Sequence, residues 1–135
     1  MQDTLTASTI AVIEHFNEVF NRHDVDAIMA AMTDDCVFEN TFPPPDGGSH
    51  VGQTAVRAFW QRLFHSSPKA HFETEELFAC GDRCVVRWLY TFVDQRGNIG
   101  RLRGVDLFRV RDGKVAQKLS YAKAHSALAK QASGQ

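Results

Sequence analysis

The sequence predicts an α+β domain in which one curved antiparallel sheet carries helices on one face. The first half shows helical periodicity, with apolar residues at three- and four-residue spacing over residues 12–20 and 55–64. The second half holds strand-like runs bounded by the short turn segments "CGDR", "DQRGN" and "RDG". Four such runs follow one another, at residues 70–79, 84–93, 99–110 and 114–124.

The helices are expected before the four strands. Phe16 and Phe20 lie on the apolar stripe of a first helix. Asp24 is suited to cap a second helix, whose apolar face runs from Val25 to Met32. A third helix is predicted over residues 55–64. The element order is therefore helix, helix, strand, helix and four hairpin-linked strands.

The strand between the second and third helices is predicted at "CVFENTF", residues 36–42. It runs into "PPPDGGSHVG", residues 43–52, whose prolines and glycines are expected to form an irregular loop of the kind that lines sites. We expect one domain over residues 1–135, with its core at about 10–123 and a frayed tail at 126–135.

Composition and charge exclude several classes of protein. The 135 residues carry a net charge of −1 without a basic stripe, which argues against a nucleic-acid partner. No run approaches the ~18 consecutive apolar residues of a membrane span, and the first residues lack the pattern of a secretory signal. Three cysteines form no dense framework, so we expect reduced thiols in a cytoplasmic protein. No metal-ligand spacing or cofactor motif is present, so neither is predicted.

The segment "RGVDLFRVRDGKV", residues 103–115, places an aspartate among the apolar residues of a predicted strand. Strand alternation puts Gly104, Asp106 and Phe108 on the same side. A buried carboxylate without a partner is unfavourable, so Asp106 is expected to face a pocket or to have a partner.

Two environments are open for Asp106. Desolvation in an apolar pocket favours the protonated acid, whereas an ion pair favours the carboxylate. Lys118 on the next strand has the same parity as Ser120 and can face the same cavity. Arg101 or Arg103 would reach Asp106 only through a bulge in the strand.

The strand at residues 84–93, "CVVRWLYTFV", is apolar at nearly every position. If Trp88 faces the helices, Val85 and Leu89 face the other side of the sheet. An outer face that carries apolar side chains favours a partner, and we predict a homodimer through this open sheet face.

Three segments occur in a characteristic order and spacing: "NRHDVDAIMAAMTDDCVFEN", "VGQTAVRAFW" and "GVDLFRVRDGKV". Over residues 10–123 the chain resembles the nuclear transport factor 2-like superfamily, close to its SnoaL-like and ketosteroid isomerase-like branches. The resemblance implies a cone, in which the curved antiparallel sheet wraps around about three N-terminal helices and leaves a deep apolar pocket. It also implies a dimer through the open sheet face, as in many members.

The resemblance extends to single pocket residues. Isomerases of this family place a general-base aspartate where this chain has Asn40, and an oxyanion-hole tyrosine where it has Phe16. Their second oxyanion donor, an aspartic acid, matches Asp106, and a supporting tyrosine matches Trp60. The SnoaL-type cyclases use an aspartate on the last strand, where this chain has Ser120. One of these polar roles is retained and the others are replaced, so ordinary ketosteroid isomerase activity is not expected.

Asp106 is the candidate catalytic residue, which would polarise or deprotonate a ligand. The candidate ligand-binding residues are Phe16, Asn40, Trp60, Trp88, Tyr90, Lys118 and Ser120. Asn40 is not a base at neutral pH, so it either orients a ligand or caps the loop that follows it.

Two functions remain open. The first is a small-molecule protein with an apolar pocket, acting as an isomerase, lyase or cyclase on a carbonyl-bearing ligand. The second is a non-catalytic ligand-binding or protein-interaction module of the same fold. The missing base and the apolar outer sheet face favour this second function.

Overall fold

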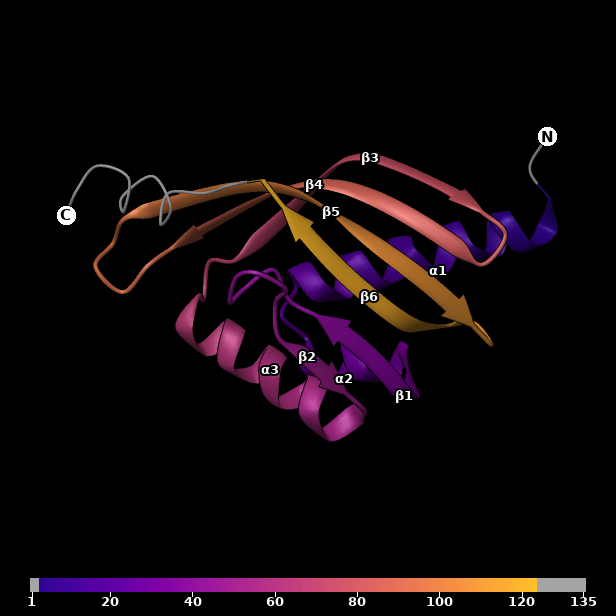
Figure 1. Cartoon of the computed structure of the whole chain (residues 1–135), viewed down its shortest axis with the longest axis horizontal. Helices are drawn as coiled ribbons and strands as arrows, with labels where there is room; N and C mark the ends of the chain where they lie inside the picture. Colours follow the sequence, from indigo (N-terminus) through magenta and orange to yellow (C-terminus); the bar gives the residue numbers. More distant parts are fainter. Residues whose placement is uncertain (1–2, 124–135) are drawn as a thin grey trace.

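A computed structural model describes residues 3–123, and this part of the chain forms three helices and one six-stranded sheet (Figure 1). The elements are α1 (Thr4–Asn21), α2 (Val25–Ala30), β1 (Met32–Glu39), β2 (Ser49–Val51), α3 (Gln53–Ser66), β3 (His71–Cys80), β4 (Arg83–Val93), β5 (Ile99–Arg111) and β6 (Lys114–Ala122). The α+β class and the curved sheet are confirmed. The tail predicted to fray, residues 126–135, lies outside the described residues.

The sheet is mixed, with the strand order β2-β1-β6-β5-β4-β3. β1 pairs with β6 in parallel, whereas the other neighbouring strands are antiparallel. The expectation of a wholly antiparallel sheet is corrected at this pair. Parallel neighbours need a long crossover connection, which here runs through α3 and four further strands, β2 to β5. Nothing local in β1 identifies its neighbour.

The segment around β1 differs from the prediction at both ends. Asp24 caps α2 as expected, because its side chain accepts a hydrogen bond from the backbone N–H of Ala27. However, α2 ends at Ala30, and Met32 begins β1 instead of continuing the helix. Within the loop predicted at residues 43–52, β2 forms a short edge strand that pairs with β1.

The long strands arch over α1, and α3 lies beneath β1 and β2 (Figure 1). Phe20 of α1 holds these layers together. Its ring makes edge-to-face contacts with Trp60 at 4.9 Å, Phe64 at 5.1 Å and Phe72 at 5.5 Å, which lie on α3 and β3. The inner face of the sheet is therefore covered by aromatic side chains from α1 and α3.

Gly104 lets an indole lie close against the inner face of the sheet. It is the register partner of Trp88, and a Cβ at position 104 would lie 2.6 Å from the Trp88 ring. That separation is too short for any side chain. The glycine thus positions Trp88 beside the strand that carries Asp106 two residues later.

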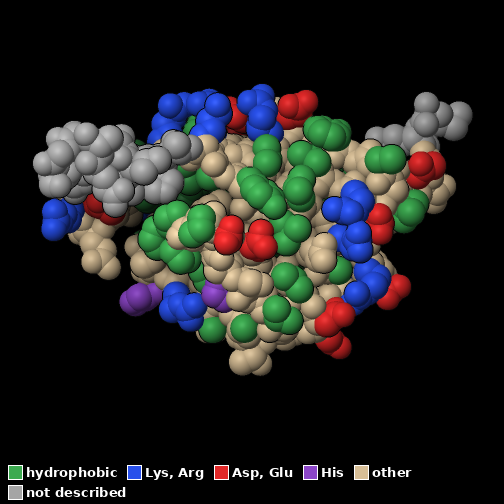
Figure 2. All heavy atoms as spheres, viewed as in Figure 1, with side chains coloured by type: hydrophobic (Ala, Val, Ile, Leu, Met, Phe, Trp, Pro, Cys, Tyr) green, Lys and Arg blue, Asp and Glu red, His purple; other side chains and the backbone are tan. Residues whose placement is uncertain are grey.

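The outer face carries an apolar row that crosses four strands in register. We define the outer apolar row as Phe78, Val85, Leu107 and Leu119, which are successive register partners from β3 to β6. Phe78 is 56% exposed. Figure 2 shows hydrophobic side chains grouped across the middle of the face on which β6 lies, with charged side chains along its upper edge. Leu89 shares this outer face.

Candidate functional site

The site is built on the inner face of β5 and β6. Asp106 lies directly opposite Ser120, and Lys118 points to the same face two residues away. The Ser120 hydroxyl donates to Asp106 Oδ1 at 2.6 Å, and Lys118 Nζ lies 3.2 Å from Asp106 Oδ2. Lys118 also donates to Ser120 Oγ at 3.2 Å, which closes a ring of three contacts. We call these residues the Asp106–Lys118–Ser120 cluster.

The cluster is buried, with Asp106, Lys118 and Ser120 only 4%, 5% and 8% exposed. Buried charges persist when they are paired and hydrogen-bonded, and both conditions are met here. Lys118 is therefore the partner of Asp106. The alternative partner Arg103 instead makes two contacts of 3.0 Å with Glu75.

Aromatic rings surround the Lys118 ammonium. Five ring centroids lie between 5.0 and 6.0 Å from Nζ. They belong to Phe20, Phe38, Trp60, Phe72 and Phe108. Ring faces attract a cation, so these side chains and Asp106 together compensate the buried positive charge. The five rings come from five different elements, and only the folded chain brings them together.

Two mainly apolar pockets meet at Lys118. The smaller pocket has a cavity volume of about 10 Å³, room for about one water molecule, and is lined by Asn17, Thr74, Asp106 and Lys118 together with apolar side chains. The larger pocket has a cavity volume of about 80 Å³ and opens to solvent. Six of the predicted ligand-binding residues line this larger pocket: Asn40, Trp60, Trp88, Tyr90, Lys118 and Ser120. Lys118 thus borders both spaces, whereas Asp106 lines only the smaller one and Ser120 only the larger one.

Phe16 is not among the residues that line these two pockets. It is fully buried, and its ring lies 5.8 Å from Phe108 and 5.9 Å from Phe20. The neighbouring Asn17 lines the smaller pocket instead. Where the resemblance implied a hydrogen-bonding tyrosine, this chain has a packing residue.

Asn40 directly follows β1 and combines the two roles considered for it. Its Oδ1 accepts a hydrogen bond of 2.8 Å from the backbone N–H of Thr41, which stabilises the start of the loop. The same residue lines the larger pocket. Since the carbonyl oxygen is engaged, the –NH₂ group is the part of the amide left for a ligand.

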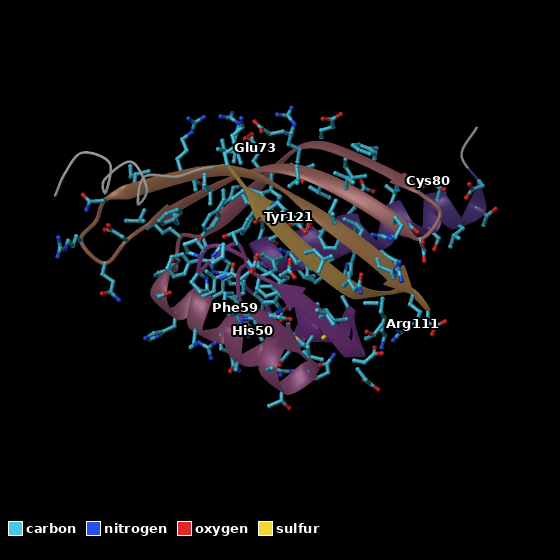
Figure 3. The ribbon with its side chains drawn as sticks, in the orientation of Figure 1. His50, Phe59, Glu73, Cys80, Arg111 and Tyr121 are labelled. Carbon is cyan, nitrogen blue, oxygen red and sulfur yellow. The ribbon has the colours of Figure 1, made fainter. Side chains whose placement is uncertain are left out.

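Tyr90 and His50 stay uncharged near neutral pH for the same physical reason. Burial raises the pKa of Tyr90, and the side chain of Ser67 offsets this only in part. Burial, followed by the charge of Arg62, lowers the pKa of His50. The His50 ring lies 4.8 Å from Phe59, and Figure 3 shows the two side by side.

Asn17 and Thr74 were not identified from the sequence. A signal for Asn17 was present, because it lies on the apolar stripe of α1 between Ile13 and Phe20 at helical spacing. A polar residue in such a stripe indicates a pocket or a buried partner. Thr74 is exposed on β3 but pairs with Trp88, so it lies on the inner face, where it lines the smaller pocket.

Within residues 3–123, no three His, Cys, Asp or Glu side chains lie close enough to hold a metal ion. None of the helices in this range combines the length and the apolar character required to cross a membrane. The three cysteines are free thiols. Burial raises the pKa of Cys84 to about 11, so this thiol is protonated at neutral pH.

The sequence profile of the SnoaL-like domain matches residues 13–118. No match was found among curated proteins. An NTF2-like protein of unknown function from Mesorhizobium loti is similar in structure, with a TM-score of 0.77 and 36% sequence identity. The similarity covers 92% of this chain and 98% of that protein.

Two further solved structures share the fold at lower identity. A candidate polyketide cyclase from Xanthomonas campestris pv. campestris has a TM-score of 0.80 and 22% identity, over 96% of this chain and 98% of its own. An LEH-like epoxide hydrolase from M. tuberculosis has a TM-score of 0.75 and 19% identity, over 87% of this chain and 84% of its own. At these identities the similarity establishes the fold alone.

Proposed function

The chain belongs to the SnoaL-like domain family, and from this premise we propose that it binds an apolar, carbonyl-bearing small molecule in its inner pocket and acts on it. One observation carries the proposal. Asp106 and Lys118 form a buried ion pair, in which Lys118 borders both mainly apolar pockets and Asp106 borders the smaller one. Buried charge at the wall of an apolar cavity is typical of sites that bind or transform ligands.

Asp106 is the base of the proposed chemistry. Its carboxylate takes a proton from the carbon next to the ligand carbonyl, and the C–H electron pair moves into the enolate. Lys118, Ser120 and Asn40 orient the ligand, and the Lys118 ammonium stabilises the negative charge that develops on the oxygen. Return of the proton to another carbon gives an isomerase, whereas attack of the enolate on a second carbonyl gives a cyclase and elimination gives a lyase.

The candidate polyketide cyclase and the epoxide hydrolase among the similar proteins are compatible with a ligand pocket in this fold. For this chain we favour the carbonyl chemistry, because Ser120 stands where a second acid on the last strand would be needed. Ordinary ketosteroid isomerase activity is not proposed, since Asn40 cannot accept a proton.

The test begins with thermal shifts against apolar ketones, steroids and aromatic polyketides. A ligand at ~100 times its Kd stabilises the fold by about 2.7 kcal/mol, which raises the midpoint by several degrees. Ketones that bind are then incubated in D₂O, and exchange of their α-hydrogens is followed by NMR.

Asp106→Asn should slow this exchange by about 10²-fold or more. Asp112→Asn is the matched control, because Asp112 is exposed in the β5–β6 turn and its positive φ suits asparagine. Exchange that continues at the wild-type rate in Asp106→Asn would exclude Asp106 as the base.

The outer apolar row favours a second function, in which the chain is a non-catalytic interaction module, and we propose that it forms a homodimer through this face in either case. Val85→Glu places a charge in the centre of the row and should yield a monomer by sedimentation. Leu5→Glu is the control, because Leu5 is 56% exposed on α1 and does not belong to the outer apolar row. If Val85→Glu keeps the wild-type mass, the interface lies elsewhere.

We also propose that the protein works in the cytoplasm, because its three cysteines are unpaired thiols as expected in a reducing compartment. Fractionation of the source cells tests this proposal. Recovery of the protein outside the cytoplasmic fraction would contradict it.

A further inference from the structure

Both tryptophans of the chain line the larger pocket, and neither indole N–H has an acceptor within the described residues. Trp60 is 1% exposed and Trp88 is 4% exposed, so bulk water does not reach these groups. A buried donor without an acceptor destabilises a protein by about 1–3 kcal/mol. Two such donors in one pocket therefore need an explanation beyond packing.

The surroundings of Trp60 contain no strong acceptor. Its ring contacts Phe38 at 4.4 Å, Phe20 at 4.9 Å and Phe59 at 5.5 Å. Aromatic faces accept a hydrogen bond only weakly. The charged neighbour, Lys118, is itself a donor. Nothing in this environment satisfies the Trp60 N–H.

Trp88 lies against the sheet backbone over Gly104 and makes an edge-to-face contact with Phe72 at 5.2 Å. The backbone of its own strand is engaged in pairing with β3 and β5. Its indole N–H is therefore also without an acceptor among the described residues.

Most of the remaining polar groups of the larger pocket add donors, and the hydroxyls of Thr41 and Tyr90 can both donate and accept. Lys118 uses two of its three N–H groups within the cluster, and Ser120 donates its hydroxyl hydrogen to Asp106. The Asn40 carbonyl oxygen already accepts from Thr41. The pocket therefore presents more hydrogen-bond donors than acceptors to any molecule within it.

We propose that the indole N–H groups of Trp60 and Trp88 bind two acceptor oxygens of the ligand, and that the ligand class is a neutral, apolar compound with two carbonyl-type oxygens. This inference rests on the proposed function and adds the two specificity-determining residues and the number of acceptors. A carboxylate fits less well, because the pocket already holds a balanced ion pair and a further negative charge would be buried without a counter-ion.

The experiment uses three probes of nearly the same shape that carry two, one or no carbonyl groups: 2,2-dimethylindane-1,3-dione, 2,2-dimethylindan-1-one and 2,2-dimethylindane. None has a hydrogen next to a carbonyl on the five-membered ring, so binding is measured without turnover. We expect Kd to fall about fivefold to tenfold with each added carbonyl.

The direct readout is the ¹H–¹⁵N NMR spectrum, in which a chain with two tryptophans gives two indole cross-peaks. The dione should move both indole protons downfield, whereas the hydrocarbon should not. Benzothienylalanine keeps the ring shape of tryptophan but has sulfur in place of N–H. Replacing either tryptophan with it should weaken binding of the dione about fivefold. The same replacement should leave the Kd of the hydrocarbon unchanged.

Equal affinity for the dione and the hydrocarbon would overturn the inference while leaving a functional apolar pocket. An equal loss of affinity for the dione and for the hydrocarbon in the benzothienylalanine variants would also overturn it, because the indoles would then contribute only shape. If none of the three probes binds the wild-type chain, the pocket function itself fails and this inference fails with it.

Discussion

Replacing Lys118 with methionine removes the ammonium from the buried ion pair but keeps an unbranched side chain of similar length. Asp106, whose side chain is 5% exposed, is then left with Ser120 as its partner in the cluster. Breaking a buried pair in this way costs about 3–5 kcal/mol. For a domain of this length, that loss lowers Tm by roughly 10–20 °C.

The double variant Lys118→Met, Asp106→Leu separates pairing from packing. Replacement of a whole buried pair by apolar side chains is often neutral, so the double variant should return to within about 1–2 kcal/mol of the wild type. Urea denaturation of the wild type, both single variants and the double variant gives the coupling energy directly.

Arg57→Met is the control for the loss of an ion pair as such. Its partner Asp26 has a side chain that is 90% exposed, and the substitution should cost less than about 1 kcal/mol. If the effects of the two single substitutions at Lys118 and Asp106 add within about 0.5 kcal/mol, the two charges are not coupled and the cluster is not an ion pair in solution.

Two further predictions concern the rest of the fold. Gly104→Ala drives a Cβ against the Tyr121 carbonyl oxygen and the Trp88 ring, and should destabilise the chain by about 1–3 kcal/mol in urea denaturation. A Cβ in Gly48→Ala meets only ordinary contacts and should change stability by less than about 0.5 kcal/mol. In the native protein at pH 8 a thiol reagent should label the exposed Cys80 rapidly and leave Cys84 unlabelled, because the raised pKa of the Cys84 thiol suppresses its thiolate; labelling of both at equal rates would contradict this account.

The alternation of side chains made the centre of the site predictable. Asp106 lies four strand residues before Val110, and a period of two is enough to place it on the inner face with Phe108. The same alternation places Lys118 and Ser120 on one face of their strand, and this requires no knowledge of the strand pairing. Which cation would reach Asp106 could not be decided in this way, because the register between β5 and β6 depends on the hairpin and its bulge.

Long-range geometry accounts for what the sequence did not reveal. The rings around Lys118 come from positions as distant as Phe20 and Phe108, and no local pattern shows that they converge. The parallel pairing of β1 with β6 has the same origin. Asn17 is a different case, since its place in the apolar stripe of α1 was visible and only its significance was missed.

The residues that replace the expected acids of the pocket have a common effect on its hydrogen bonding. Asn40 and Ser120 stand where the resemblance implied acids, and each now uses an acceptor or donor within the fold: Asn40 accepts from Thr41, and Ser120 donates to Asp106. Lys118 then balances the remaining carboxylate. Two of the expected acids are therefore absent, and Asp106 is paired. The polar groups that lack a partner are hydrogen-bond donors, so selectivity in this pocket should depend on the acceptor atoms of the ligand more than on its shape.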